Sequence, residues 1–206
     1  TVLNEDDFDI EDSNLDVFIG KKNRIALKDM DYSSWKLELE KDQAILLELE
    51  ELINQITPAE DKKLQTLYRL IDEKMTHPIN EGNKKLIIFS AFATTTNYLY
   101  KHITKYVLDK YVPHTAPTSG TKGLETTLET KHRDLNSLLT YFSPQSKDRN
   151  LLFPDDQREI EVLIATDVIS EGQNLQDADM MVNYDIHWNP VRIIQRFGRV
   201  DRIGSK

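Results

Sequence analysis

Cysteine is absent from the 206 residues, and this absence excludes disulfide bonds within the chain. A structural zinc site would have to take all of its ligands from histidine and carboxylate side chains. The five histidines show no H-x-x-x-H spacing, so we expect no metal site. No stretch approaches the roughly 20 apolar residues that span a bilayer, and none resembles a secretory signal. We therefore expect a cytoplasmic protein without a membrane partner.

Several catalytic signatures are missing as well. The chain has no Ser-His-Asp order, no C-x-x-C and no G-x-G-x-x-G, which argues against a small-molecule α/β enzyme. It also lacks the phosphate-binding loop GxxxxGK[ST] and a DExx box; the steps Gly20-Lys21 and Lys122-Gly123 stand in other contexts. We therefore expect this chain alone to hydrolyse no nucleoside triphosphate.

Charge is distributed unevenly along the chain. The formal net charge of −9 argues against a surface that binds nucleic acid everywhere. Residues 1–20 carry seven acidic side chains and no Lys or Arg, whereas residues 190–206 carry four Arg and one Lys against Asp201. A local basic patch on an acidic protein can still contact phosphates, although cations also favour helix C-termini for electrostatic reasons alone.

Hydrophobic periodicity divides the chain into three segments. Residues 1–20 lack periodicity and are interpreted as an acidic lead-in or linker. Residues 21–80 contain two helices with three-four apolar spacing, one over 33–56 and one after Pro58, which we expect to form a hairpin that packs on the rest. Residues 81–206 alternate short apolar runs with helices, which predicts a parallel sheet with right-handed crossovers. The expected strands lie near 86–89, 111–115, 162–165 and 180–184.

The last predicted helix starts at Asn189-Pro190, a capping residue followed by proline at the first helical position. At 100° per residue, four polar side chains fall within an arc of about 80°, and four apolar ones lie opposite, where they are expected to dock on the sheet. Arginine suits phosphate recognition because its planar fork stays charged. Alternatively, this face is solvated or pairs with acids of the same chain. The polar side chains are Arg192, Gln195, Arg199 and Arg202, and the apolar ones Ile193, Ile194, Phe197 and Val200.

A second polar segment, residues 165–175, directly follows a predicted buried strand. Ligands of open α/β sheets bind beyond the carboxyl ends of the strands, and Thr166 and Asp167 occupy such an end. Free backbone N–H groups there could receive a phosphate. The alternative is that Thr166 or Asp167 simply caps a short helical turn that ends at Gly172.

Together these segments resemble superfamily-two helicases. Residues 164–206 resemble motifs five and six, and residues 195–204 read Q-R-F-G-R-V-D-R-I-G, matching QxxGRxxRxG. Residues 185–190 resemble the D-x-x-WNP block of Swi/Snf-type ATPases, residues 86–92 resemble motif four, and residues 61–67 resemble the helix that leads into this lobe. The form E-G-x-N-L of motif five and Asp201 in motif six point to the bacterial branch, which includes ATPases that recycle RNA polymerase.

The resemblance implies the fold and the partners. It implies an α/β, RecA-like open parallel sheet with helices on both faces, the second lobe of a P-loop NTPase fold, preceded by the helical hairpin. Such a lobe belongs to an ATP-dependent translocase of nucleic acid, double-stranded DNA rather than RNA. Its N-terminal lobe would bind most of the ATP and Mg²⁺, and RNA polymerase or another protein is a possible partner. A bacterial protein of this kind would be associated with the nucleoid.

The resemblance also implies roles for individual residues. Arg199 and Arg202 match the arginine fingers that reach the γ-phosphate from the second lobe, and Gln195 matches a residue that senses it. Gly172 and Asn174 match positions near the nucleotide, to which Asp167 is added for its place at the strand end. The positions expected to contact nucleic acid are Ser90, Thr94 and Thr166. The alternative function is a non-catalytic RecA-like scaffold whose helical hairpin docks a protein partner.

Overall fold

The computed structural model describes residues 18–19, 25–26, 31–111, 114–118, 125–167, 173–186 and 189–200. The chain divides into two compact units, Thr1–Thr57 and Pro58–Lys206, whereas the sequence pattern predicted three segments with boundaries after residues 20 and 80. Each unit is described by itself. Within the described residues, no helix is both long enough and apolar enough to cross a membrane.

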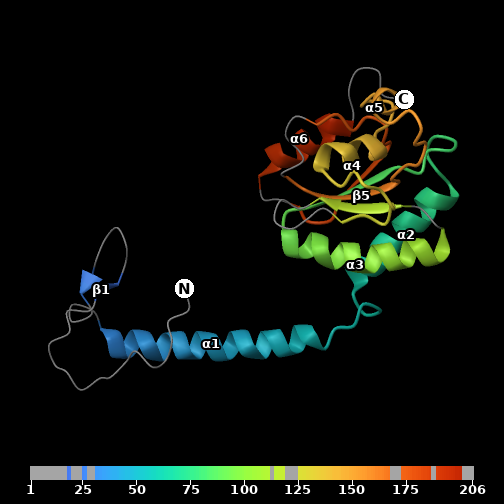
Figure 1. The fold of residues 1–206 in the computed structure, drawn as a ribbon. Coiled ribbons are helices and arrows are strands. Elements are labelled where there is room, and N and C mark those ends of the chain that lie inside the picture. The colour runs from blue at the N-terminus through green and yellow to red at the C-terminus, as the bar shows by residue number, and fades with distance from the viewer. Residues whose placement is uncertain are drawn as a thin grey trace. The chain divides into compact units, whose positions relative to one another are not determined.

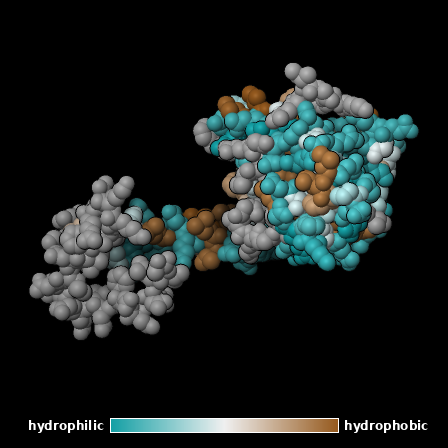
Figure 2. Space-filling model, turned by 45° about the horizontal axis from the view of Figure 1, so that its top comes forward, coloured by the Kyte–Doolittle hydropathy of each residue, from teal (hydrophilic) through white to brown (hydrophobic). Residues whose placement is uncertain are grey.

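The first unit contains a short antiparallel pair and one long helix (Figure 1). β1 (Phe18–Ile19) pairs with β2 (Ile25–Ala26), and α1 spans Tyr32–Asn54, close to the predicted 33–56. Asp31 caps α1 by accepting a hydrogen bond from the N–H of Ser34 at 3.2 Å. No residue of α1 is buried, and Figure 2 shows its apolar side chains at the surface. The predicted hairpin of α1 with the next helix stays a prediction.

The second unit is built on a four-stranded parallel sheet, as the alternation of strands and helices predicted. The strand order is β4-β5-β3-β6. The two central strands, β5 and β3, are buried along their whole length. The expected strand at 111–115 starts later, because Tyr111 still closes a helix by donating its N–H to the carbonyl of Val107 at 2.8 Å. The strands are β3 (Leu86–Ser90), β4 (Thr115–Thr118), β5 (Val162–Thr166) and β6 (Met180–Asn183).

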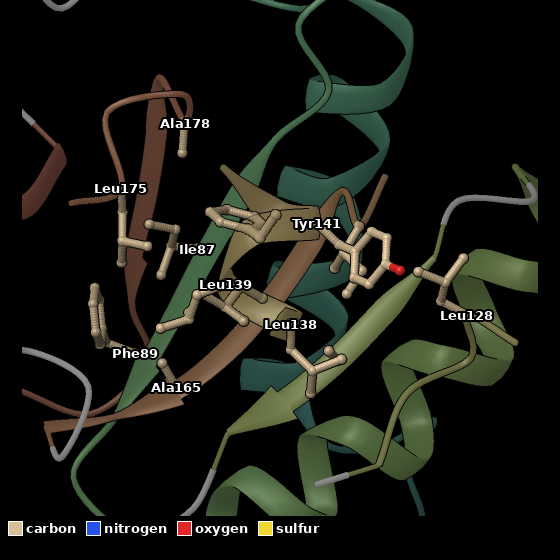
Figure 3. Packing of buried hydrophobic residues seen from close by; sticks show 13 residues of the cluster. Ile87, Phe89, Leu128, Leu138, Leu139, Tyr141, Ala165, Leu175 and Ala178 are labelled. Carbon is tan, nitrogen blue, oxygen red and sulfur yellow. The ribbon is translucent and has the colours of Figure 1, made fainter. Parts of the chain in front are cut away.

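Helices cover both faces of the sheet (Figure 1). Alternation along β3 sends Leu86 and Ile88 to one face and Ile87 and Phe89 to the other, as the period of two in a strand requires. The first face packs against α2 and α3, and the second against α4 (Figure 3). This arrangement is the expected RecA-like α/β fold. The helices are α2 (Lys62–Thr76), α3 (Ala93–Lys110), α4 (Leu135–Phe142), α5 (Arg149–Leu152) and α6 (Pro190–Val200).

Polar side chains fasten α2 to the lobe in addition to its apolar stripe. Asp61 caps the helix and accepts a hydrogen bond from the Tyr98 hydroxyl at 2.8 Å. Asp72 accepts hydrogen bonds from two tyrosine hydroxyls and from the Lys110 ammonium at 2.7 Å. Lys74 forms an ion pair with Asp179 in which both side chains are almost fully buried. α2 is therefore part of the second unit, and the unit boundary precedes it.

We predict that the Lys74–Asp179 pair is a major determinant of stability. Lys74→Met would leave the Asp179 carboxylate buried with only the backbone and side-chain amides of Asn80 as donors. The expected cost is about 3–5 kcal/mol of the free energy of unfolding, measured by urea denaturation. Lys36→Met is the matched control, because Lys36 pairs with Glu40 on the exposed surface at 3.9 Å, and should cost less than about 1 kcal/mol. Equal effects of the two variants would contradict the prediction.

We also predict an acid-dependent contribution from Asp72. Partial burial opposes ionisation of this carboxyl, but hydrogen bonds from Lys110, Tyr106 and Tyr111 outweigh it and hold its pKa below the ordinary value. As pH falls, the unfolded chain takes up the proton first, so the contribution is present above about pH 4 and is lost as pH falls through the lowered pKa of the folded state. The stability difference between wild type and Asp72→Asn should therefore shrink between pH 6 and pH 3. An unchanged difference would contradict this assignment.

Candidate functional site at the carboxyl edge of the sheet

Three parallel strands end side by side at one edge of the sheet. Ser90 at the end of β3 is in register with Thr166 at the end of β5, and Asn183 ends β6 on the other side of β3. Asp167 follows β5 directly, and Asp185 lies two residues after β6. Because parallel strands all deliver their carboxyl ends here, residues distant in sequence come together, and α6 packs against β6 beside them.

The centre of this edge is the buried side chain of Arg196, on α6. Its exposed fraction is 0%, so the charged side chain is completely inaccessible to solvent. Its Nε donates to Asp167 at 2.6 Å, and one Nη donates to the Asn183 side chain at 2.8 Å and to the Asp185 carbonyl at 3.3 Å. Its guanidinium carbon lies 5.2 Å from the ring centroid of Phe89. A buried cation is tolerated only when it is paired and hydrogen-bonded, and these contacts meet that requirement.

Asp185 connects the same edge to β3 and α2. Its carboxylate accepts hydrogen bonds from the Ser90 hydroxyl and from the Lys63 ammonium, the latter at 2.8 Å. Burial raises the cost of ionising Asp185, yet these two donors together hold its pKa below the ordinary value. The Lys63 ammonium also lies 4.0 Å from the ring centroid of Tyr184. The strand ends and α2 thus share one network of charged hydrogen bonds.

The predicted start of α6 is correct, but its predicted apolar face is only partly so: Val200 packs against the core, whereas Ile194 and Phe197 do not. The helix begins at Pro190, and the Asn189 side chain accepts a hydrogen bond from the N–H of Val191 at 3.0 Å. Ile194 and Phe197, expected to dock on the sheet, are 68% and 55% exposed. Arg196 points inward in their place, because the strand ends beneath it present a carboxylate and an amide rather than an apolar surface.

The predicted nucleotide-binding residues lie around Arg196 where they are described. Gln195 is exposed, whereas Arg199 is partly buried and its carbonyl accepts a hydrogen bond from the N–H of Leu175 at 3.1 Å. That bond brings Asn174 close to Arg199. Asp167, predicted to contact the nucleotide, accepts a hydrogen bond from Arg196, and its predicted role stays a prediction. Arg202 and Gly172 lie outside the described residues.

Several buried polar atoms at this edge lack a hydrogen-bond partner within the described part of the chain. They are Arg199 Nε, Asn174 Oδ1, Thr166 Oγ1 and one terminal nitrogen of Arg196. Buried polar groups are normally satisfied, and each exception calls for an explanation. The concentration of unmatched donors and acceptors here is what a site that is completed by another molecule or domain would leave.

The residues predicted to contact nucleic acid differ in their accessibility. Thr94 is exposed in the first turn of α3. Ser90 is fully buried, and its hydroxyl donates to Asp185. Thr166 is 7% exposed. Only Thr94 of the three presents its side chain to solvent in this conformation, and the role of all three stays a prediction.

Reasoning from the sequence missed Arg196, Asn183, Asp185 and Lys63 as parts of the site. Asp185 stands in the D-x-x-WNP block, which could have marked it. The burial of Arg196 was harder to predict, because the sequence of a helix does not reveal whether the strands that it packs on supply a carboxylate. Its position among apolar neighbours at 193, 197 and 200 was the available clue.

A hollow of about 600 Å³ lies elsewhere on the unit and is not assigned to this site. Its lining carries both signs of charge, and Arg158 and Asp156 in it neutralise each other at 2.7 Å. Among the described residues, no group of three or more His, Cys, Asp or Glu side chains is arranged to hold a metal ion. The carboxyl edge therefore remains the candidate site.

Residues 62–204 match the family model of the helicase conserved C-terminal domain. The chain belongs to this family. The matched range begins at the first residue of α2, in agreement with the contacts that fasten this helix to the sheet. Motifs four, five and six, as the sequence resemblance assigns them, lie on β3, at the end of β5 and on α6, and the lobe is a RecA-like helicase C-terminal domain.

Short segments of this helicase domain are similar to named proteins. A segment of 47 residues is 53% identical to the uncharacterized ATP-dependent helicase YqhH of Bacillus subtilis. This segment covers 23% of this chain and 8% of that protein. Over 54 residues the domain is 43% identical to the RNA polymerase-associated protein RapA of Vibrio cholerae, 26% of this chain and 6% of that protein. The ATP-dependent RNA helicase DBP8 of Kluyveromyces lactis is 34% identical over 110 residues, 52% of this chain and 25% of that protein.

A solved structure, the C-terminal part of the Fun30 ATPase domain, aligns with 70% of this chain and 37% of its own, with 22% identity and a TM-score of 0.45. The matched segments are thus small parts of these relatives: 8% of YqhH, 6% of RapA and 25% of DBP8.

We predict that the stability of the helicase domain does not require glycine at position 198. A Cβ built at Gly198 meets nothing within 4 Å, and alanine stabilises a helix interior by up to about 1 kcal/mol relative to glycine. Gly198→Ala should therefore leave the melting temperature of this chain unchanged or raise it, as measured by circular dichroism. A clear loss of stability would show that the space above Gly198 is needed within the lobe itself.

Proposed function

We propose that this chain is the C-terminal lobe of an ATP-dependent translocase of double-stranded DNA, in which Arg199 and Arg202 act as arginine fingers. The observation that carries the proposal is the state of Arg199. This residue lies on α6 at the carboxyl edge of the sheet, partly buried and with its Nε unmatched within the described residues. Asn174 supplies a second unmatched group beside it.

The chemistry of this edge suits a phosphate. A guanidinium directed at the γ-phosphate stabilises the charge that spreads over its oxygens during transfer, and such fingers contribute about 10³–10⁵ in rate. Gln195, exposed one turn before Arg199, is placed to sense the same group. Magnesium, when bound, would neutralise phosphate charge. The carboxylates of this edge are already engaged, Asp167 by Arg196 and Asp185 by Ser90 and Lys63, so we assign the metal ligands to the N-terminal lobe.

The outer face of α6 supports a site shared between two lobes. Val191, Ile194 and Phe197 recur every three residues and are 50%, 68% and 55% exposed. A contiguous apolar surface beside polar groups is typical of an interface. Placing the N-terminal lobe against this surface would cover these apolar side chains and would explain why Gly198, on the same side of the helix, needs no side chain.

The nucleic-acid track is assigned to the side of β3 and β5, with Thr94 as its exposed contact and Thr166 and Ser90 beneath it. The relatives named above include both an RNA helicase and an RNA polymerase-associated protein. The D-x-x-WNP block of this chain favours the Swi/Snf pattern, and therefore double-stranded DNA. We extend the proposal to a cytoplasmic, nucleoid-associated protein with RNA polymerase as a candidate partner.

A second candidate function, a protein-docking scaffold, draws its support from α1. This helix buries none of its residues, although Trp35, Leu46 and Ile53 are among its large apolar side chains. A scaffold predicts that α1 alone captures a partner while the full-length protein shows no ATP hydrolysis. The unmatched Nε of Arg199 at the carboxyl edge is the observation that favours the translocase.

We predict that Arg199→Ala in the full-length protein lowers DNA-stimulated kcat for ATP hydrolysis by about 10³–10⁵. Binding of ATP should change little, because the N-terminal lobe is expected to hold most of the nucleotide. Steady-state ATPase assays with double-stranded DNA, and separately with RNA, measure the effect. Arg69→Ala on the exposed surface of α2 is the control and should keep wild-type turnover. Wild-type turnover in the Arg199 variant would remove the finger assignment.

A further inference from the structure

The side chain of Arg196 joins α6 to three separate strands. Its acceptors belong to Asp167 after β5 and to Asn183 and Asp185 at and after β6. Its guanidinium lies over the Phe89 ring of β3. No other arginine in the described part of the chain is completely inaccessible to solvent. We call this set of contacts the Arg196 clamp.

The geometry of the clamp is specific to a guanidinium. Arginine presents five donors in a rigid planar fork, whereas lysine presents a point charge on a flexible stem. Nε of Arg196 donates to one acceptor and a terminal nitrogen donates to two more. These three hydrogen bonds together fix the plane of the guanidinium. A lysine at this position would keep the charge but could not maintain all three hydrogen bonds.

The clamp determines the rotation of α6 about its axis. In most surface helices an apolar stripe sets this rotation, but Ile194 and Phe197 of α6 are exposed. Among the described residues, the inward contacts of α6 include the clamp, the hydrogen bond from the N–H of Leu175 to the Arg199 carbonyl, and Val200, which packs against the hydrophobic core. Arg199 lies one helical turn from Arg196, so any rotation released by loss of the clamp moves the Arg199 guanidinium.

We infer that Arg196 is a positioning residue for ATP hydrolysis, with Asp167 as its charged partner: the pair holds α6 so that Arg199 meets the transferred phosphate. The inference rests on the function proposed above. It assigns the Asp167 carboxylate to Arg196 and not to the nucleotide. A displacement of about 1 Å in a catalytic group can cost about 100-fold in rate, and the clamp prevents such a displacement.

The test uses the full-length protein with ATP and double-stranded DNA. Arg196→Lys and Asp167→Asn should each lower kcat by about 100-fold and change KM for ATP by less than about threefold, since an interaction that acts only in the transition state alters kcat. The double variant should lose no more than about the larger single loss, because both substitutions break one pair. If Arg196→Lys does not fold, Asp167→Asn alone provides the test.

Arg149→Lys is the matched control. Arg149 is 6% exposed and also donates several hydrogen bonds, to the carbonyls of Gln157 and Arg158 and to Glu159. It lies on α5, and its acceptors belong to residues 157–159 and not to the strand ends that hold Arg196. This variant should lower the melting temperature about as much as Arg196→Lys while keeping wild-type kcat. A purely structural role for Arg196 would instead give both variants the same kinetics.

Each outcome has one meaning. If wild type hydrolyses no ATP with DNA or RNA, the proposed function is wrong and the positioning role falls with it. If wild type is active and Arg199→Ala abolishes turnover, but Arg196→Lys keeps kcat within twofold, only the positioning inference is overturned. A raised KM with unchanged kcat would likewise overturn it, because it would make Arg196 a binding residue. If the decreases in kcat of the two single variants add in the double variant, Asp167 is not the charged partner through which Arg196 acts.

Discussion

The carboxyl edge of the sheet depends on one interaction, the burial of the Arg196 guanidinium against Asp167 and Asn183. A cation cannot be removed from water without compensation, so the fold must bring an acid and an amide to the same point. Parallel strands achieve this because β5 and β6 end at the same edge on either side of β3. Once Arg196 is held, α6 has one orientation. Val191, Ile194 and Phe197 then face outward and are exposed.

The same physical principle explains why α2 belongs to the lobe. Its apolar stripe would allow the helix to slide along the sheet, but Lys74 is buried against Asp179, and Lys63 reaches Asp185. Charged hydrogen bonds of this kind depend on geometry more strongly than apolar contacts do. α2 is thereby placed in a defined register beneath the strand ends, and through Asp185 it contacts the network that includes Arg196. The match of the family model from residue 62 reflects this integration.

Much of the fold could be predicted because it follows from local patterns. The apolar runs at Leu86 and Val162 became adjacent central strands, and Asn189-Pro190 marked the start of α6. The expected strand before Thr115 was displaced because α3 extends to Lys110, which propensity alone did not reveal. Two residues of the predicted apolar face of α6, Ile194 and Phe197, are exposed, because apolar periodicity assumes an apolar surface beneath the whole helix. For the candidate site, the resemblance directed attention to Arg199 and Asn174, which lie together, but it missed the clamp between them and the strand ends.

The sequence by itself determined the class of fold, the family and the cationic character of the last helix, since all three follow from local residue spacing and from short sequence motifs. Only the tertiary structure decided which arginine is buried and which is available. Arg196 and Arg199 are chemically identical and differ by one helical turn. The partner that separates their roles, Asp167, lies 29 residues away from Arg196 in the chain and adjacent to it in space. Such a pairing is a consequence of strand order, which brings distant carboxyl ends to one edge and gives a buried charge its counterion.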